Sequence, residues 1–461
     1  MEGLWSRRHR ALTTGLILTI TLAAFESLAI STILPIVARE LGGVELYGWV
    51  FAAYFLGSLV GIVLTGGLID RAGLIRPFVV ALGLFGLGLA IGGVAPSMPF
   101  LVAGRLLQGL GGGGIAPVAY VAIGRSLPER LRPAMFAMLS TAWVLPGVLG
   151  PVVAATVAEQ VSWRAVFIGL LPIIGLAGLL TLPALAAVPA ATPVAPGSLP
   201  RARSARRLPQ AVRVAVGAAL LLAGLSEPLL ILVVPLVAIG AWLALPAFAR
   251  LAPAGTLRLV PGLPSAILLR GALTFAFFGA QAYVPLAFQG WRGLSASLTG
   301  IGLTAATLAW TGGAWVQARS IARLGAPRFV RLGFAAVVVG TIGTAAVLLP
   351  EMPIALAIGS MIVAAGGMGF AYAPLSLIVL KEAPPGEEGT ATSGLQLSDT
   401  LGLALGTGVA GAMVAWAARL GAPSWVGLAG AFAAATVMGL LGLAASGRVA
   451  IPGRGTPGRL R

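Results

Sequence analysis

Three charged side chains stand inside long apolar segments of this chain, where they could handle protons or ions: Glu26, Arg105 and Asp399. An ionisable residue at membrane depth costs about 2.5–3.5 kcal/mol on insertion scales, so such residues usually face a partner or a water-filled cavity. A carboxyl group can take up and release a proton, whereas an arginine stays charged. The combination therefore predicts proton coupling, with Glu26 and Asp399 as proton carriers and Arg105 as the charge that tunes them.

Each of these residues also has a plainer structural interpretation. Glu26 lies about 22 Å along a helix that starts at Ala11, in its outer half, and could simply bond to a neighbouring helix. Asp399 lies roughly 10 Å into its segment, and could be the structural partner of Arg71 or Arg105. Arg105 could instead tie loops together at the membrane rim.

A second group of residues suggests a substrate cavity in the C-terminal part of the chain. These residues are polar or aromatic and stand in otherwise apolar segments, so together they would suit a small amphipathic ligand. The alternative for each one is an anchoring aromatic at the membrane interface or an ordinary hydrogen bond between helices. They are Gln281, Tyr283, Gln289, Trp310 and Tyr372.

The composition fixes where these residues must sit. The chain has 461 residues, of which 58% are apolar and 9% are charged, whereas a soluble domain carries about 25% charged residues. This excludes a soluble enzyme and predicts an all-α integral membrane protein. The chain has no Cys, one His and a single Lys, Lys381, which does not follow the glycines of a Walker A loop. We expect no enzyme activity, no cofactor and no metal site.

Apolar segments predict fourteen membrane spans, arranged as two six-helix halves plus two extra linking helices. The extra pair falls in residues 211–249, which could also form a helical pair that lies on the membrane without crossing it. We expect an N-terminal half at 1–187, linkers with the extra helices at 188–270, a C-terminal half at 271–446 and a basic tail at 447–461. The spans are predicted at 11–34, 47–69, 78–94, 100–123, 133–157, 165–185, 214–225, 228–248, 271–288, 296–316, 332–349, 353–380, 392–417 and 424–445.

The basic residues set the orientation. Of 30 Lys and Arg residues, 25 fall in loops on the side of the N-terminus, four fall in the opposite loops, and Arg105 alone falls inside a span. Cytoplasmic loops carry such an excess, which predicts cytoplasmic N- and C-termini in a multi-pass protein of the cell membrane. The net charge of +17 therefore faces anionic membrane lipids and gives no reason to expect nucleic acid as a partner.

Short glycine motifs mark the helix contacts. The pattern R-x-G-x-x-R occurs at residues 71–76 and again at 323–328, in the loop after the second span of each half, which indicates an internal repeat. Residues 109–114 are glycines apart from Leu110, so the fourth span can approach a neighbour closely. Gly147, Gly150 and Pro151 predict close packing and a kink in the fifth span.

Residues 66–76, which read GGLIDRAGLIR, match the loop motif G-x-x-x-D-R-x-G-x-x-R at every specified position, and with it the chain resembles the major facilitator superfamily. The resemblance implies that Gly66, Asp70, Arg71, Gly73 and Arg76 form a loop that controls the conformational switch. Arg105, Gln108 and Gly109 are similar to the superfamily's fourth-helix motif, which is linked to proton transfer. Gly150 and Pro151 partly match its fifth-helix antiporter motif.

Glu26 followed by Pro35 is similar to the first-helix pattern of the fourteen-helix drug:proton antiporters. The resemblance implies a proton-coupled exporter of small amphipathic or lipophilic compounds, a multidrug efflux protein that works as a monomer by alternating access. Two alternatives stay open at this point: a transporter of one defined metabolite or lipid, and a membrane scaffold or sensor that transports nothing.

Overall fold

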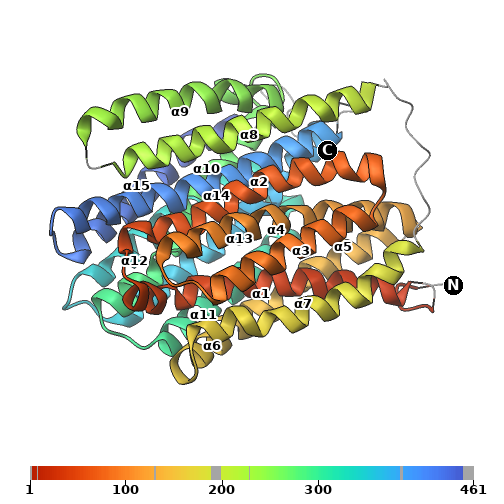
Figure 1. Ribbon diagram of the computed structural model, residues 1–461. Coiled ribbons are helices and arrows are strands. Elements are labelled where there is room, and N and C mark those ends of the chain that lie inside the picture. Colours follow the sequence, from red (N-terminus) through yellow and green to blue (C-terminus); the bar gives the residue numbers. More distant parts are fainter. Residues whose placement is uncertain are drawn as a thin grey trace.

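The computed structural model describes residues 3–7, 9–128, 131–187, 199–227, 229–384 and 388–449, and within these ranges the chain forms helices and no strands. The long helices run side by side along one direction, as Figure 1 shows, so the predicted all-α membrane architecture is confirmed. Within the described residues, twelve helices are long and apolar enough to cross a membrane. The 29-residue helix α11 and the broken pair α5–α6 lie at the positions of the two remaining predicted spans.

The first half of the bundle holds seven helices, because the fifth span is split in two. The split falls at Ala142 and Trp143, just before Pro146, whose missing N–H fits the first turn of a helix. The helices are α1 (Arg10–Leu41), α2 (Tyr47–Ala72), α3 (Ile75–Gly93), α4 (Met98–Ser126), α5 (Arg132–Thr141), α6 (Val144–Gln160) and α7 (Trp163–Ala186).

The second half is preceded by a hairpin of two helices, α8 (Leu199–Leu225) and α9 (Leu230–Leu251). The first span of the second half is also broken: α10 (Leu263–Gln281) is followed, after Pro285, by a short π-helix, η4 (Leu286–Trp291). The remaining helices are α11 (Ala296–Leu324), α12 (Ala326–Ala345), α13 (Ile354–Glu382), α14 (Glu388–Arg419) and α15 (Ser424–Ala445).

Two predicted helix starts were wrong. Helix α8 begins at Leu199 and not at residue 214, because a helix can continue through a polar, arginine-rich segment that hydropathy does not detect. Helix α10 begins at Leu263 and not at residue 271, so Arg270 lies inside a helix instead of in a loop. Arg105 is therefore not the only basic residue within a span.

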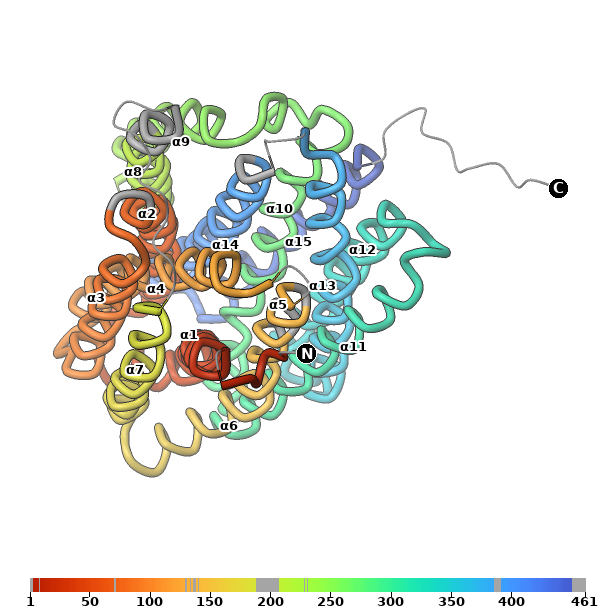
Figure 2. The backbone as a smooth tube through the Cα atoms, turned by 90° about the vertical axis from the view of Figure 1, so that its right-hand side faces the viewer, coloured from red at the N-terminus to blue at the C-terminus, as the bar shows by residue number. Residues whose placement is uncertain are grey.

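The α8–α9 hairpin packs along the seam between α2 and α14, one helix from each half, and Figure 2 shows it at one corner of the bundle. The two hairpin helices touch at Gly217 and Gly240, where an added Cβ would come within 2.6 Å of the facing carbonyl oxygen. Apolar clusters on this seam combine side chains of all three helices, such as Leu56 of α2, Ala218 of α8 and Ala404 of α14. The hairpin therefore contacts both halves.

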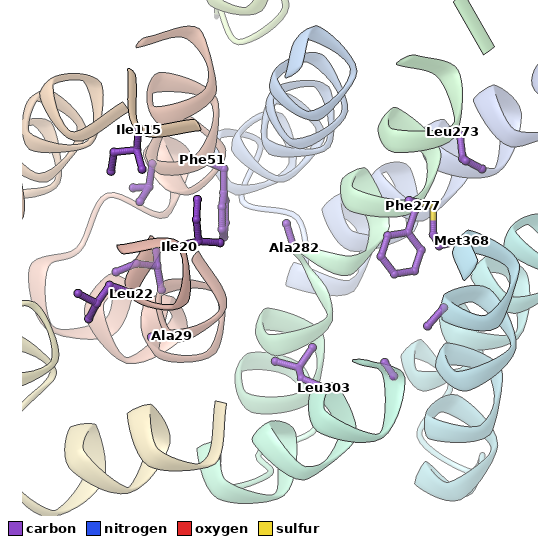
Figure 3. Close-up of a cluster of buried hydrophobic side chains, with 14 of the residues drawn as sticks. Ile20, Leu22, Ala29, Phe51, Ile115, Leu273, Phe277, Ala282, Leu303 and Met368 are labelled. Carbon is purple, nitrogen blue, oxygen red and sulfur yellow. The ribbon is translucent and has the colours of Figure 1, made fainter. Parts of the chain in front are cut away.

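We use "near end" for the end of the bundle where α1 begins at Arg10, and "far end" for the end where α1 finishes at Leu41. Each half has its own share of the apolar core: in Figure 3, Ile20, Phe51 and Ile115 belong to the first half, whereas Leu273 and Phe277 belong to the second.

The two halves meet near the far end of the bundle. Gly48 of α2 lies so close to Gly411 of α14 that a Cβ added to Gly48 would be 2.6 Å from the Cα of Gly411. Gly300 of α11 lies against the backbone of Pro151 in α6, and the hydroxyl of Thr304 donates to the carbonyl of Val148 at 2.9 Å. Small residues thus let the halves come into backbone contact at this end.

Candidate coupling site: two buried ion pairs

The first ion pair joins α1 to α4 within the first half. Arg105 Nη1 donates to Glu26 Oε1 and also to Gln108 Oε1, the latter at 2.7 Å. Glu26 and Gln108 are completely buried, and the Arg105 side chain is 3% exposed. Because removing charge from water is expensive, a buried pair of this kind needs several further hydrogen bonds to be stable.

Helix α2 supplies the remaining support for Arg105. The Nε of Arg105 donates to the backbone carbonyl of Val50 at 3.1 Å, and its guanidinium lies over the ring of Tyr54, 4.3 Å from the centroid. A cation over an aromatic face is attracted by the negative ring face. Glycines of α4 allow this close approach, since a Cβ at Gly109 would lie 2.0 Å from the carbonyl oxygen of Tyr54.

Glu26 and Gln108 each keep one buried polar atom without a partner. Within the described part of the chain, neither Glu26 Oε2 nor Gln108 Nε2 makes a hydrogen bond. An unpaired buried polar atom costs free energy, and such atoms in native proteins commonly mark a functional group or a bound water. The free carboxylate oxygen is therefore the place where Glu26 could receive a proton.

The second ion pair joins α10 to α14 within the second half. Arg270 Nε donates to Asp399 Oδ1 at 2.7 Å, and the side chains are 4% and 13% exposed. Arg270 Nη1 donates to the carbonyl of Tyr372 at 2.6 Å and to the hydroxyl of Ser376 at 3.1 Å. The hydroxyl of Tyr372 donates to Asp399 Oδ2 at 3.0 Å, so both carboxylate oxygens accept hydrogen bonds.

Aromatic rings line one side of this second pair. The Cζ of Arg270 lies 2.9 Å from the ring centroid of Tyr372, and that ring packs edge-on against Trp310, with 5.5 Å between the centroids. Trp310 in turn packs against Phe277 and Phe278, with 5.6 and 6.1 Å between the ring centroids. The arrangement brings Trp310 and Tyr372 of the predicted substrate cavity together with Asp399.

The two pairs lie at different levels of the bundle. Arg105 is seven residues from the start of α4 at the far end, and Arg270 is seven residues from the start of α10 at the near end. At 1.5 Å per residue, each arginine lies about 10 Å along its helix from that end of the bundle. Among the described residues, no group of three or more His, Cys, Asp or Glu side chains could hold a metal ion.

The sequence model of one family, described as Major Facilitator Superfamily, matches residues 16–407, which is most of the chain and includes both pairs. The chain belongs to the major facilitator superfamily. Superfamily membership makes it a transporter, as the resemblance of its motifs implied.

Curated relatives of the chain include an MFS-type transporter and a protein named for multidrug resistance. The chain is 38% identical over 153 residues to an acurin A biosynthesis cluster MFS-type transporter of Aspergillus aculeatus. This match covers 33% of this chain and 28% of the relative. It is 33% identical over 153 residues to multidrug resistance protein 3 of Bacillus subtilis, with 33% of this chain and 30% of the relative covered. These matches span less than a third of the relatives' length.

Solved transporter structures show the same fold over nearly the whole chain. A POT family transporter in complex with 5-aminolevulinic acid superposes with a TM-score of 0.70 at 15% identity, covering 95% of this chain and 96% of that one. The xylose transporter XylE from E. coli superposes with a TM-score of 0.62 at 15% identity, covering 94% and 97%. At such low identity these likenesses concern the fold alone.

The superfamily loop motif covers the last turns of α2, the two residues between α2 and α3, and the first two residues of α3. Its Gly73 ends α2 with a φ of 71°, and Gly325 of the repeated pattern ends α11 with a φ of 78°. Glycine adopts this left-handed conformation readily, which explains the glycine at both places. Gly66 has open space around it, Arg76 is exposed, and the side chains of Asp70 and Arg71 lie outside the described part of the structure.

The antiporter-like glycines of α6 face two different neighbours. A Cβ on Gly147 would lie 2.2 Å from Thr307 of the other half, whereas Gly150 faces Phe25 and Leu28 of α1. Pro151 lies inside α6, which continues past it to Gln160. The interruption between the helices α5 and α6 falls earlier, at residues 142–143.

The other predicted cavity residues lie where the halves meet. Gln289 Nε2 donates to the carbonyl of Thr32 at 3.0 Å, while its Oε1 has no partner among the described residues. Tyr283 is completely buried beside Tyr47 and donates to the carbonyl of Thr407 at 2.8 Å. Gln281 is half-buried at the end of α10.

Arg270 is the site residue that sequence reasoning missed. Asp399 was expected to pair, if at all, with Arg71 or Arg105, but its partner is Arg270. The predicted span started one residue after this arginine, because a charged residue at the edge lowers local hydropathy. Gly262 followed by Pro264 is a helix-start signal that could have extended the span to include Arg270.

Proposed function

We propose that this transporter exports small amphipathic or lipophilic compounds in exchange for protons, by alternating access. The observation that carries the proposal is the Glu26 carboxylate, which is completely buried, is bound by Arg105 through one oxygen and has no partner for the other oxygen among the described residues. Relatives named as multidrug transporters support the class of ligand.

In the proposed cycle, Glu26 takes up a proton when the far end of the bundle is open, and the substrate leaves. The neutral carboxylic acid no longer holds Arg105, which keeps its charge. The halves then close at the far end, the proton leaves toward the near end, and the next substrate binds. One charge that crosses 100 mV supplies about 2.3 kcal/mol, so one proton per cycle can drive a useful gradient.

The proposed orientation places the near end in the cytoplasm, since most loop arginines lie there, and the far end outside the cell membrane. Asp70, Arg71 and the glycines of the loop motif act in the conformational switch. Asp399 makes a smaller contribution to coupling than Glu26 because it mainly holds Arg270 and Tyr372 in place. The transporter works as a monomer surrounded by lipid, with protons and one small amphipathic ligand as its partners.

The test is flux in proteoliposomes with and without a pH gradient, with wild type beside Glu26→Gln. A pH-sensitive dye trapped in the vesicles reports proton movement when compounds from a panel of amphipathic drugs are added. We expect wild type to move protons in response to a subset of the panel, and Glu26→Gln to lose this response while it still reaches the membrane. Normal proton-driven efflux by Glu26→Gln would eliminate the proton role of Glu26.

The matched control is Glu351→Gln, which neutralises an exposed carboxylate in the turn before α13. It should behave as wild type. A response to one chemical class only would favour the transporter of a defined metabolite or lipid. No flux of any compound under any gradient would favour the scaffold or sensor.

A further inference from the structure

Both buried carboxylates described above are neutralised within their own half. Glu26 is bound by Arg105, and Asp399 is bound by Arg270. A cationic ligand that sought either carboxylate would have to displace a built-in arginine from it. Breaking a buried ion pair is strongly unfavourable, because it leaves an uncompensated charge.

The surroundings of Asp399 contain the elements that bind an organic cation elsewhere in proteins: a carboxylate beside aromatic faces. In this structure Arg270 already occupies that position. Its Nε is bonded to Asp399, and its guanidinium carbon lies 2.9 Å from the centroid of the Tyr372 ring. The carbonyl of Tyr372 and the hydroxyl of Ser376 accept from Nη1 and hold the guanidinium there.

The protein does not enclose this site completely. The Asp399 side chain is 13% exposed, and Trp310, Phe278 and Tyr372 are each half-buried rather than enclosed. A ligand can therefore contact the aromatic rings while both carboxylate oxygens remain bonded to Arg270 and Tyr372. Such contact would suit an uncharged aromatic or lipophilic compound.

We propose that Arg270 is a built-in cation that fills the cation position beside Asp399 and Tyr372, so that the transporter selects electrically neutral ligands over organic cations. This inference rests on the proposed export of amphipathic compounds and specifies their charge. Arg270 is here a residue that sets specificity through Asp399.

One consequence concerns the driving force. If a neutral ligand leaves in exchange for one proton, each cycle moves one net positive charge inward. The membrane potential then adds to the pH gradient as a driving force. A singly charged cation exchanged for one proton would move no net charge, so dependence on membrane potential distinguishes the two cases.

The experiment measures equilibrium binding of a matched pair of probes to the purified full chain: tetraphenylphosphonium, which is a cation, and triphenylphosphine oxide, which is neutral. Arg270→Gln should bind tetraphenylphosphonium at least tenfold more tightly than wild type, with binding of the neutral probe changed by less than about twofold. A merely structural role for Arg270 would not produce this gain. Adding Asp399→Asn to Arg270→Gln should remove it.

Two controls accompany these variants. Arg270→Lys keeps a cation in place and should show no gain. Arg319→Gln removes an exposed arginine that lies over Trp315, with 4.9 Å to the centroid, and should bind both probes as wild type does.

Equal binding of tetraphenylphosphonium by wild type and Arg270→Gln would overturn the proposal, as would a gain that persists without Asp399. If Arg270→Gln does not fold, Asp399→Asn alone decides. A loss of tetraphenylphosphonium binding in that variant would show that Asp399 accepts external cations beside Arg270 and would overturn the proposal, whereas unchanged binding supports it. These measurements report binding alone. A failure of the proposed proton-driven export would appear instead as a loss of flux in proteoliposomes, so the two failures can be told apart.

Discussion

The two halves of the bundle each bury an arginine–carboxylate pair, but the carboxylates are bonded differently. Glu26 is completely buried and uses one oxygen, while its other oxygen has no partner among the described residues. Asp399 is 13% exposed, and each of its oxygens accepts a hydrogen bond. An incompletely bonded carboxylate is suited to exchange a proton, whereas a fully bonded one is suited to hold other groups in place.

The arginines of the two pairs are held in similar ways. Each donates to a backbone carbonyl, that of Val50 for Arg105 and that of Tyr372 for Arg270, and each lies over a tyrosine ring. The difference between the pairs therefore comes from the carboxylates and their depth, not from the arginines. Variants that change one pair at a time can test this division of roles.

The largest expected effect follows from removing the arginines. Arg105→Met leaves the fully buried Glu26 without its charge partner, and we expect a loss of about 3–5 kcal/mol in stability. Arg270→Met leaves Asp399 partly exposed and still bonded by the hydroxyl of Tyr372, so we expect a smaller loss of about 1–3 kcal/mol. Thermal unfolding in one detergent, compared at equal ionic strength, measures both.

The double variant Glu26→Gln with Arg105→Met is the control, because it removes both charges. It should recover a large part of the stability lost in Arg105→Met. Equal losses in Arg105→Met and Arg270→Met would mean that burial depth does not distinguish the two pairs.

The next effect concerns coupling. Glu26→Gln should lower pH-driven flux at least tenfold, since the group that exchanges the proton is gone. Asp399→Asn keeps an acceptor for Arg270 and a partner for Tyr372, and we expect it to change pH-driven flux by no more than about threefold. Proteoliposomes that contain each variant at matched density provide the measurement. A tenfold loss in Asp399→Asn would assign proton coupling to both pairs.

The sequence predicted one pair much better than the other, for a physical reason. Glu26 and Arg105 fall inside the predicted apolar spans, where their cost in a membrane makes them conspicuous, and the structure indeed joins them. Arg270 lies as far into its helix as Arg105 does, but the predicted span began at residue 271, and so it looked like an ordinary loop arginine. Its partner Asp399 is 129 residues away, and no local pattern reveals that contact.

The fold shows the same division. Long apolar segments predicted the membrane-spanning helices, because a helix needs about 20 mostly apolar residues to cross the hydrocarbon core of a bilayer. The packing of the α8–α9 hairpin against α2 and α14 depends on tertiary contacts. Such contacts have no signal in a single sequence.

The tyrosines allow a finer comparison. Tyr372→Phe keeps the ring over Arg270 but removes the hydroxyl that donates to Asp399 Oδ2, and we expect a loss of about 1.5–3 kcal/mol, as for a hydrogen bond to a charged group. Tyr54→Phe keeps the ring face over Arg105, which is the contact that this tyrosine makes with its ion pair, and should cost less than about 1 kcal/mol. Thermal unfolding of the two variants side by side tests whether the hydroxyl matters only in the second half.

The smallest expected effect lies at the far end, above the pair that contains Glu26. Glu159 at the end of α6 accepts from the backbone N–H of Ala296 at 2.7 Å and from the hydroxyl of Ser297 at 2.7 Å, so it caps α11 of the other half. A carboxylate at a helix N-terminus contributes about 0.3–1 kcal/mol, so Glu159→Gln should raise the fraction of molecules open at the far end about two- to fivefold. The chain has no native cysteine, so spin labels on Val161→Cys and Leu420→Cys, both exposed at this end, can report the distance between the halves. If Glu159→Gln and the control Glu351→Gln give the same distance distribution as wild type, the other contacts between the halves hold the far end closed, and the charge of Glu159 does not control access to Glu26.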